Sequence, residues 1–271
     1  MIDGFYATDL QVHSVRSHDG RATILEQCER AILLGLDVIG FSEHKDFDPQ
    51  DPVVDYFDYE RYRAEIEEAR ARFGHQLTIR MGVEIDYQKW FEDRIRTWLE
   101  DHPFDFVIGS VHYVDRAKLM TPEYTRNRTR EEAYRVYFEA VQHSVESGLI
   151  DIVGHLEYAN RRGVPLYGPY DPSPYREDVI RIFRAMIARG VALEINTAGL
   201  RQGAGHTYPC DAHIKLYASL GGRLLTIGSD AHHPDDLAAS YCTAADLALA
   251  AGLKSITDWQ DRRPKPVPLR P

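Results

Sequence analysis

Cysteine is scarce in this chain, and its spacing indicates neither disulfides nor thiolate metal sites. Three cysteines, Cys28, Cys210 and Cys242, lie far apart among 271 residues, and no two have the spacing of a CxxC motif. An odd, scattered set argues against a disulfide framework and against a zinc site built from thiolates. We interpret each cysteine as a small core or surface residue.

Long apolar runs and clusters of basic residues are also missing. No stretch approaches the roughly 20 apolar residues of a membrane span, and Asp3 stands where a signal peptide would carry basic residues. The 32 Lys and Arg are outnumbered by 42 Asp and Glu, giving a formal charge of −10. Since nucleic-acid binding depends on clustered basic side chains, we expect no nucleic acid and no membrane as partner. We expect a cytoplasmic protein that binds a small molecule, which one or two arginines could hold if it is anionic.

Short apolar runs alternate with helical patterns, which is typical of βα units and a largely parallel sheet. Thr23 with Glu26, and Thr129 with Glu132, have the spacing of capping boxes at the start of helices. No linker or repeat divides the chain, so we predict one domain over residues 1–271, with an extended tail at 262–271. The seven predicted strands cover residues 6–12, 37–41, 77–85, 104–111, 150–154, 191–195 and 223–227.

Two segments interrupt this rhythm. Residues 47–62 are rich in Asp, Pro and Tyr, and residues 161–175 (RRGVPLYGPYDPSPY) contain too much Pro and Gly for a helix or a central strand. We expect both to be loops. Each is either a lid over a binding site or a solvated surface excursion, since composition alone does not distinguish the two.

Histidines and carboxylates recur where the predicted strands end. Asp9, Gln11 and His13 alternate along the first strand and therefore share one face. The C-terminal ends of the strands of a parallel barrel meet on one face, so groups far apart in sequence converge there. A single histidine at a strand end is usually structural, but five histidines on five strands, together with carboxylates, favour a metal cluster of Zn, Mn or Fe. Besides His13, the residues at strand ends are His44, Glu84, Asp86, His112, His155, Glu194, Asn196, Asp230 and His232.

The segments around these residues carry a family resemblance. They are DLQVHSVRSHDG (9–20), FSEH (41–44), GVEID (82–86), DFVIGSVH (105–112), DIVGH (151–155), EINTAGLRQG (194–203) and GSDAH (228–232). Together they resemble the PHP (polymerase and histidinol phosphatase) family over nearly the whole chain. Their order and spacing are most similar to its histidinol-phosphatase branch.

The resemblance implies an α/β fold, a distorted (β/α)7 barrel with two or three divalent metal ions at the C-terminal ends of its strands. It places His13, Glu84 and Asp230 at one metal. Glu84 would bridge to a second metal held by His112 and His155. Asp19, His44 and His232 would hold the third.

One position departs from the family pattern. The first motif of the family usually opens with H-x-H, and in this chain the first member of the pair is Gln11. A glutamine carbonyl is a neutral oxygen ligand that suits Mn, Fe or Mg better than Zn. We therefore keep Gln11 as a candidate ligand, at a site that is weaker, differently occupied or selective for a harder ion.

The activity that the resemblance implies is hydrolysis of a phosphomonoester, most closely L-histidinol phosphate in histidine biosynthesis. Two metal ions would lower the pKa of a shared water to give the hydroxide that attacks phosphorus. Asp230 or His232 could pass a proton to the leaving alkoxide. Candidates for gripping the phosphate are, in order of preference, Arg201, Arg161, Arg162 and Arg16.

Four more residues lie beside the expected ligands and have two possible roles. Asp86, Tyr113, Glu157 and Tyr158 could form a wall for the amine and imidazole of the substrate, or they could orient ligand imidazoles. We favour the orienting role.

Two other functions stay open. The first is a PHP phosphoesterase acting on another small phosphate ester or a nucleotide, which a substrate panel would distinguish. The second is a non-catalytic metal-binding domain in which Gln11 marks lost activity. The presence of Asp19, Glu84 and Asp230 counts against this second alternative.

Overall fold

Seven parallel strands form the central sheet of the computed structural model, which describes residues 1–270. The strands are β1 (Thr8–Val12), β2 (Val38–Lys45), β3 (Thr78–Asp86), β4 (Phe106–Ser110), β7 (Ile152–Val153), β8 (Ala192–Asn196) and β9 (Leu225–Gly228), hydrogen-bonded in that order. Between the first and last strands, Val12 forms a parallel bridge with Ala231, and the His13 amide donates to the Ala231 carbonyl at 2.9 Å. The sheet is therefore a distorted, nearly closed (β/α)7 barrel, as the resemblance implied.

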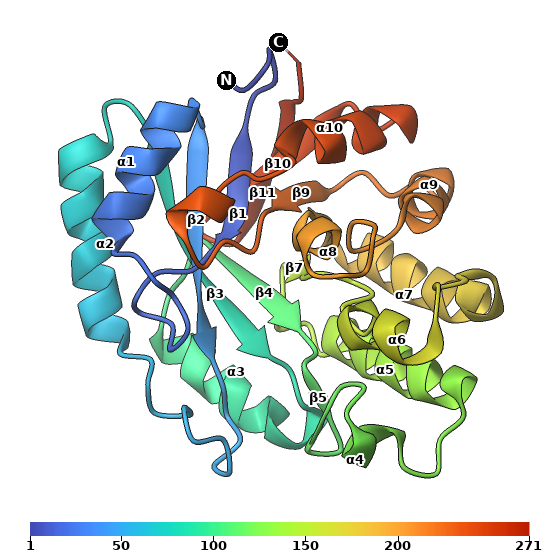
Figure 1. Cartoon of the computed structure of the whole chain (residues 1–271). Helices are drawn as coiled ribbons and strands as arrows, with labels where there is room; N and C mark the ends of the chain where they lie inside the picture. Colours follow the sequence, from blue (N-terminus) through green and yellow to red (C-terminus); the bar gives the residue numbers. More distant parts are fainter. Residues whose placement is uncertain (271) are drawn as a thin grey trace.

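Helices cover the outside of the sheet (Figure 1). The longer ones are α1 (Ile24–Leu34), α2 (Tyr59–Phe73), α3 (Glu92–Asp101), α5 (Arg130–Glu146), α7 (Arg176–Arg189), α9 (Asp211–Ser219) and α10 (Tyr241–Ala250). The shorter ones are α4 (Pro122–Thr125), α6 (Asn160–Tyr167) and α8 (Ala198–Arg201), with single 3-10 turns η1 (Lys89–Phe91), η2 (Ser173–Tyr175) and η3 (Pro234–Asp236). Both predicted capping boxes are present, at Thr23 and Thr129. Each supplies partners to amides that the first turn leaves free.

The end of the barrel at which the strands begin is closed by a C-terminal hairpin. Strands β10 (Ser255–Gln260) and β11 (Arg263–Pro268) pair antiparallel. Trp259 of this hairpin packs with Val38, Phe106 and Ala192, which are the first residues of their strands. The segment 262–271, predicted as an extended tail, thus pairs as a strand over 263–268, and the Leu269 side chain is fully buried. The site is left at the opposite end of the barrel.

Part of the segment predicted as a loop is helical. Residues 160–167 form α6 although Gly163 and Pro165 lie inside it, so the expectation of no helix over 161–175 was wrong there. The reason is tertiary. A Cβ at position 163 would lie 2.1 Å from the Tyr134 hydroxyl oxygen, so glycine allows the helix to pack closely on α5. Pro165 costs a single backbone hydrogen bond in so short a helix.

Another hairpin was not predicted from the sequence. Strands β5 (Tyr113–Val114) and β6 (Ala117–Lys118) follow directly after His112 and lie beside the site. Within residues 1–270, none of the helices combines the length and apolarity needed to cross a membrane.

Candidate metal centre

Glu84, at the C-terminal end of β3, is the centre of the site and is fully buried. Its Oε1 lies 2.9 Å from His155 Nε2 and 3.8 Å from His112 Nε2. Its Oε2 lies 3.1 Å from His44 Nδ1 and 3.5 Å from His13 Nε2. One carboxylate therefore faces four imidazoles from four different strand ends, which is the arrangement expected of a bridging ligand.

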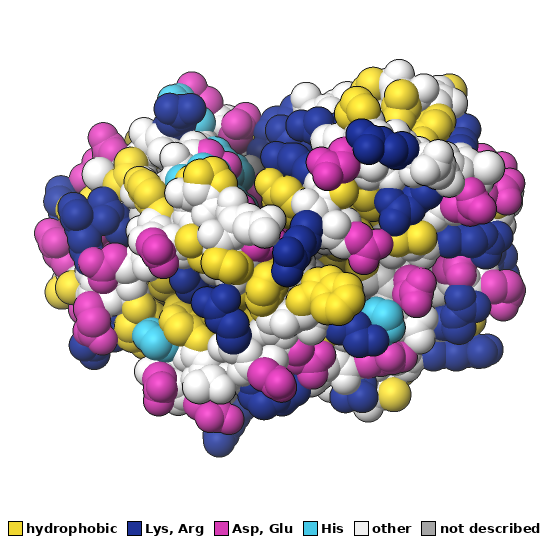
Figure 2. All heavy atoms as spheres, turned by 90° about the horizontal axis from the view of Figure 1, so that it is seen from below, with side chains coloured by type: hydrophobic (Ala, Val, Ile, Leu, Met, Phe, Trp, Pro, Cys, Tyr) yellow, Lys and Arg dark blue, Asp and Glu magenta, His cyan; other side chains and the backbone are white. Residues whose placement is uncertain are grey.

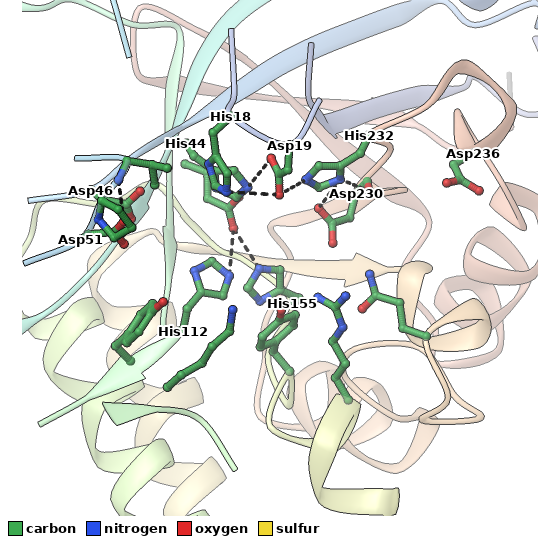
Figure 3. A pocket seen from close by; sticks show the side chains of 18 of the residues that line it. His18, Asp19, His44, Asp46, Asp51, His112, His155, Asp230, His232 and Asp236 are labelled. Carbon is green, nitrogen blue, oxygen red and sulfur yellow. Dashed lines mark hydrogen bonds and ion pairs between the residues drawn. The ribbon is translucent and has the colours of Figure 1, made fainter. Parts of the chain in front are cut away.

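Two further carboxylates complete the centre. Asp19 Oδ2 lies 3.3 Å from His232 Nε2, and Asp19 Oδ1 lies 3.7 Å from His44 Nε2. Asp230 Oδ1 lies 3.3 Å from His13 Nε2. Figure 3 shows Asp19 between His44 and His232, and His112 with His155 on the other side of the group. The structure thus brings together the eight residues that the resemblance places at the metals. Gln11, the ninth candidate, is considered separately below.

The donor set fits divalent metal ions. His13 Nε2, Glu84 Oε2 and Asp19 Oδ1 are buried side-chain atoms that, despite these close charged neighbours, make no hydrogen bond of acceptable geometry. Such atoms are costly to bury unless a ligand satisfies them. Donor atoms within 4.8 Å of one another occur in two groups here, His13 with His44 and His232, and Glu84 with His112 and His155. The centre therefore has the ligands for two or three divalent metal ions.

Burial and mutual charge perturb these groups strongly. Burial, together with the neighbouring His232 and His44, lowers the pKa of His13 to about 4, so its ring is neutral and able to bind a metal. Burial opposes the charge on His44, but Glu84 and Asp19 outweigh it and raise the His44 pKa to about 10. Without a metal, protons on His44 balance the buried carboxylates. Metal binding must displace these protons.

Several residues hold the candidate ligands in place. The Ser17 hydroxyl lies 3.2 Å from His13 Nδ1, accepts a hydrogen bond from the His44 amide at 2.9 Å and donates to Glu43 Oε2 at 2.6 Å. Neither Glu43 nor Ser17 was predicted from the sequence as a functional residue. Glu43 precedes His44 in β2, so the alternation of side chains along a strand places it on the face opposite His44. The sequence pattern therefore predicts no role for Glu43 at the metal centre. Glu194, a predicted strand-end residue, accepts from the His155 amide at 2.7 Å.

A cavity of about 730 Å³ opens over the metal centre. On this face, seen from below the view of Figure 1, histidine side chains reach the surface in a hollow beside a group of Lys and Arg side chains (Figure 2). Arg161 and Arg201 line the cavity. Arg162 is exposed outside its lining, and the Nε of Arg16 pairs with Glu65 at 3.3 Å, also outside the lining. Two of the four candidate arginines thus line the cavity, and the other two do not.

Three of the four flanking residues take one of the two roles considered, and Glu157 takes neither. Tyr158 lines the cavity, with its ring centroid 4.6 Å from that of His155, and Tyr113 lines it as well. Asp86 orients His112, because its Oδ1 accepts from the His112 amide at 2.7 Å. Glu157 is buried, contacts His213 and accepts from the Cys210 amide at 2.7 Å, so it anchors the start of α9.

Three charged residues of the cavity wall had no signal in the sequence. Asp46 and Asp51 lie in the segment after β2, and Lys118 lies on the β5–β6 hairpin. Figure 3 shows Asp46 and Asp51 on the side of His44 away from Asp230. Only the fold brings these segments to the site, since neither has a periodic pattern.

The sequence model of the PHP domain matches residues 9–198. The chain belongs to the PHP domain family. It is 32% identical over 232 residues to a protein of Lactococcus lactis named "Histidinol-phosphatase", covering 83% of each chain. It is 26% identical over 270 residues to a "Probable histidinol-phosphatase" of Deinococcus radiodurans, covering 95% of this chain and 98% of the relative.

A solved structure extends the likeness to the fold. It is the crystal structure of histidinol phosphate phosphatase from Lactococcus lactis subsp. lactis complexed with zinc, L-histidinol and phosphate. The two superpose with a TM-score of 0.86 at 29% identity, covering 96% of this chain and 99% of the other. The sequence resemblance to the family and the barrel fold are both confirmed.

Proposed function

We propose that this PHP protein is an L-histidinol-phosphate phosphatase, a metal-dependent hydrolase that converts L-histidinol phosphate and water to L-histidinol and phosphate. The observation that carries the proposal is Glu84, whose carboxylate faces four imidazoles inside a cavity that Arg161 and Arg201 also line. The relative of the same fold binds zinc, L-histidinol and phosphate. Histidine biosynthesis in the cytoplasm is the proposed setting, and a small phosphorylated metabolite is the proposed partner.

The metals would be held by the ligand sets that the family resemblance implies. These are His13, Glu84 and Asp230, then Glu84, His112 and His155, then Asp19, His44 and His232. Bound there, they supply an activated water for attack on phosphorus and positive charge for the phosphate oxygens.

The chain's own residues bind the substrate and move protons. Arg161 lines the cavity and donates a hydrogen bond to the Tyr158 hydroxyl at 2.6 Å, which holds its guanidinium where it can bind phosphate oxygens. Arg201 is held by the carbonyls of Ser229 and Asp230 at 2.5 and 3.1 Å. We assign proton transfer to the leaving oxygen to the pair of Asp230 and His232, whose Oδ1 and Nδ1 lie 3.7 Å apart.

The charge distribution of the cavity favours this substrate over a nucleotide. Arg161 and Arg201 suit a phosphate, whereas Asp46 and Asp51 put negative charge on the wall beyond His44. L-Histidinol phosphate has an anionic group at one end and an amine and imidazole at the other. A nucleoside monophosphate has no amine of comparable basicity to meet the two carboxylates.

The test is kcat/KM for L-histidinol phosphate, measured on protein purified without chelator and compared with nucleoside monophosphates and a generic aryl phosphate. We expect about 10⁴ M⁻¹s⁻¹ or more for L-histidinol phosphate, within the usual range for a native substrate. Higher turnover of a nucleotide would assign a different phosphoesterase. Bound metal without turnover of any ester would assign a metal-binding domain.

A further inference from the structure

Gln11 lies in β1 at the wall of the metal centre and is fully buried. Its Nε2 donates a hydrogen bond to Glu84 Oε1 at 2.9 Å. Its Oε1 accepts a hydrogen bond from Asn196 Nδ2 at 2.7 Å. Both ends of this amide are therefore engaged by side chains, and the carbonyl oxygen points away from Glu84.

The direction of the Gln11 amide is fixed by its neighbours. Asn196 Oδ1 accepts from the Ala198 amide at 2.9 Å, which turns Asn196 Nδ2 toward Gln11 and Glu194. Two NH₂ groups cannot hydrogen-bond to each other, so Gln11 must present its carbonyl to Asn196. Its own NH₂ then faces Glu84, whose carboxylate oxygens accept hydrogen bonds.

The surroundings leave this network in one arrangement. Glu194 Oε2 accepts from both Asn196 Nδ2, at 3.1 Å, and the His155 amide, at 2.7 Å. The backbone of Gly228 packs so closely that a Cβ there would lie 2.8 Å from Gln11 Cβ and 2.1 Å from Glu194 Oε1. Turning the Gln11 carbonyl toward the metals would turn its NH₂ toward the NH₂ of Asn196, which places two buried donors face to face.

We propose that Gln11 is not a metal ligand in this chain but a positioning residue for the bridging carboxylate of Glu84, and that the centre holds two metal ions tightly. Among the carboxylates and imidazoles of the centre, the donor atoms that lie within 4.8 Å of one another gather in two groups, His13 with His44 and His232, and Glu84 with His112 and His155. The site that His13, Glu84 and Asp230 would form lacks the fourth ligand that the family pattern offers, and these three residues do not make up either of the two groups. A third ion there is weakly held.

This proposal rests on the function proposed above only in assuming that the site binds metal ions. Its test measures metal content and not activity. Wild-type protein loaded with Mn²⁺ or Zn²⁺ and dialysed against a weak chelator is analysed for metal per chain. We expect two ions per chain in the wild type. We expect three in Gln11→His, with the third ion held at least tenfold more tightly than in the wild type.

Gln11→Met provides a matched variant, since it keeps the length of the side chain and removes the amide. We expect it to retain two ions, with a shifted metal-centre spectrum when Co²⁺ is used as the probe, because Glu84 loses the hydrogen bond from the Gln11 amide. The proposal would be overturned if the wild type held three tight ions and Gln11→Met lost one of them. Any number of tightly bound ions per wild-type chain other than two would also overturn it. Circular dichroism verifies that both variants fold.

Failure of this proposal and failure of the phosphatase proposal are distinguishable. An inactive protein with two tight ions refutes the activity and leaves the role of Gln11 intact. An active phosphatase with three tight ions refutes only the role of Gln11.

Discussion

Asp86 Oδ1 accepts a hydrogen bond from the His112 amide at 2.7 Å and lies 3.4 Å from Nδ1 of the same residue. The other ring nitrogen of His112, Nε2, faces Glu84 at 3.8 Å. A carboxylate behind a ligand imidazole fixes the orientation of the ring and raises its basicity as a ligand. The candidate metal ligand His112 and the carboxylate that supports it therefore come from the ends of adjacent strands β4 and β3.

We expect Asp86→Asn to weaken metal binding by about 10- to 100-fold, because the amide cannot polarise the His112 ring as a carboxylate does. Activity at limiting metal should fall and recover when metal is added in excess. Metal titration of activity measures this effect. Asp93→Asn, at an exposed position on α3, is the control and should leave the metal concentration that gives half-maximal activity unchanged. If both variants reach half-maximal activity at the same metal concentration, Asp86 has no role at the metal.

Arg161 and Arg162 are adjacent in sequence and form a matched pair, since only Arg161 lines the cavity. We expect Arg161→Ala to lower kcat/KM by about 100-fold, because the phosphate loses a guanidinium that binds it in the transition state. Arg162→Ala should change it less than twofold. Steady-state kinetics and inhibition by inorganic phosphate measure both. Similar losses in the two variants would contradict the assignment.

Burial, only partly offset by hydrogen bonds from Ser14 and Ser17, raises the pKa of Glu43 from 4.5 to about 7. The unfolded chain loses this proton at lower pH than the folded protein. The free energy of unfolding should therefore fall as the pH rises from about 4.5 to 7, with Glu43 contributing a loss of about 3 kcal/mol. Glu43→Gln carries no titrating proton and should lack this component.

Chemical denaturation of chelator-treated wild type and Glu43→Gln, at pH 4.5 and 7.5, measures the Glu43 component. The stability of the wild type should drop more than that of the variant between the two pH values. Parallel pH dependences would show that Glu43 titrates normally in the folded protein.

Gly163 is the close contact that permits α6 to pack on α5. We expect Gly163→Ala to lower the free energy of unfolding by about 1–3 kcal/mol, because its Cβ would meet the Tyr134 hydroxyl, which donates to Asn160 Oδ1 at 2.6 Å. Thermal or chemical denaturation measures the loss. In the Tyr134→Phe background the same substitution should cost less, because the nearest atom is gone. An equal cost in both backgrounds would place the strain elsewhere.

The seven strands and the capped starts of α1 and α5 could be predicted because they depend on local patterns. Apolar runs mark buried strands, and in the capping boxes at Thr23 and Thr129 residues three positions apart satisfy the free amides of the first helical turn. The helix over 160–167 could not be predicted this way. Gly163 and Pro165 are typical helix breakers in a local sequence pattern. The helix forms because Gly163 lets it pack closely on Tyr134 of α5.

The candidate ligands could likewise be predicted, because side chains at the ends of parallel strands must converge once a barrel forms. By itself the sequence determined the fold class, the family and the chemistry of the centre, since these follow from residue types at strand ends. Only the tertiary structure decided which way the Gln11 amide points, because Asn196, 185 positions away, fixes it. It also decided which arginines reach the cavity, since neighbours in sequence such as Arg161 and Arg162 point to different surroundings once α6 has formed.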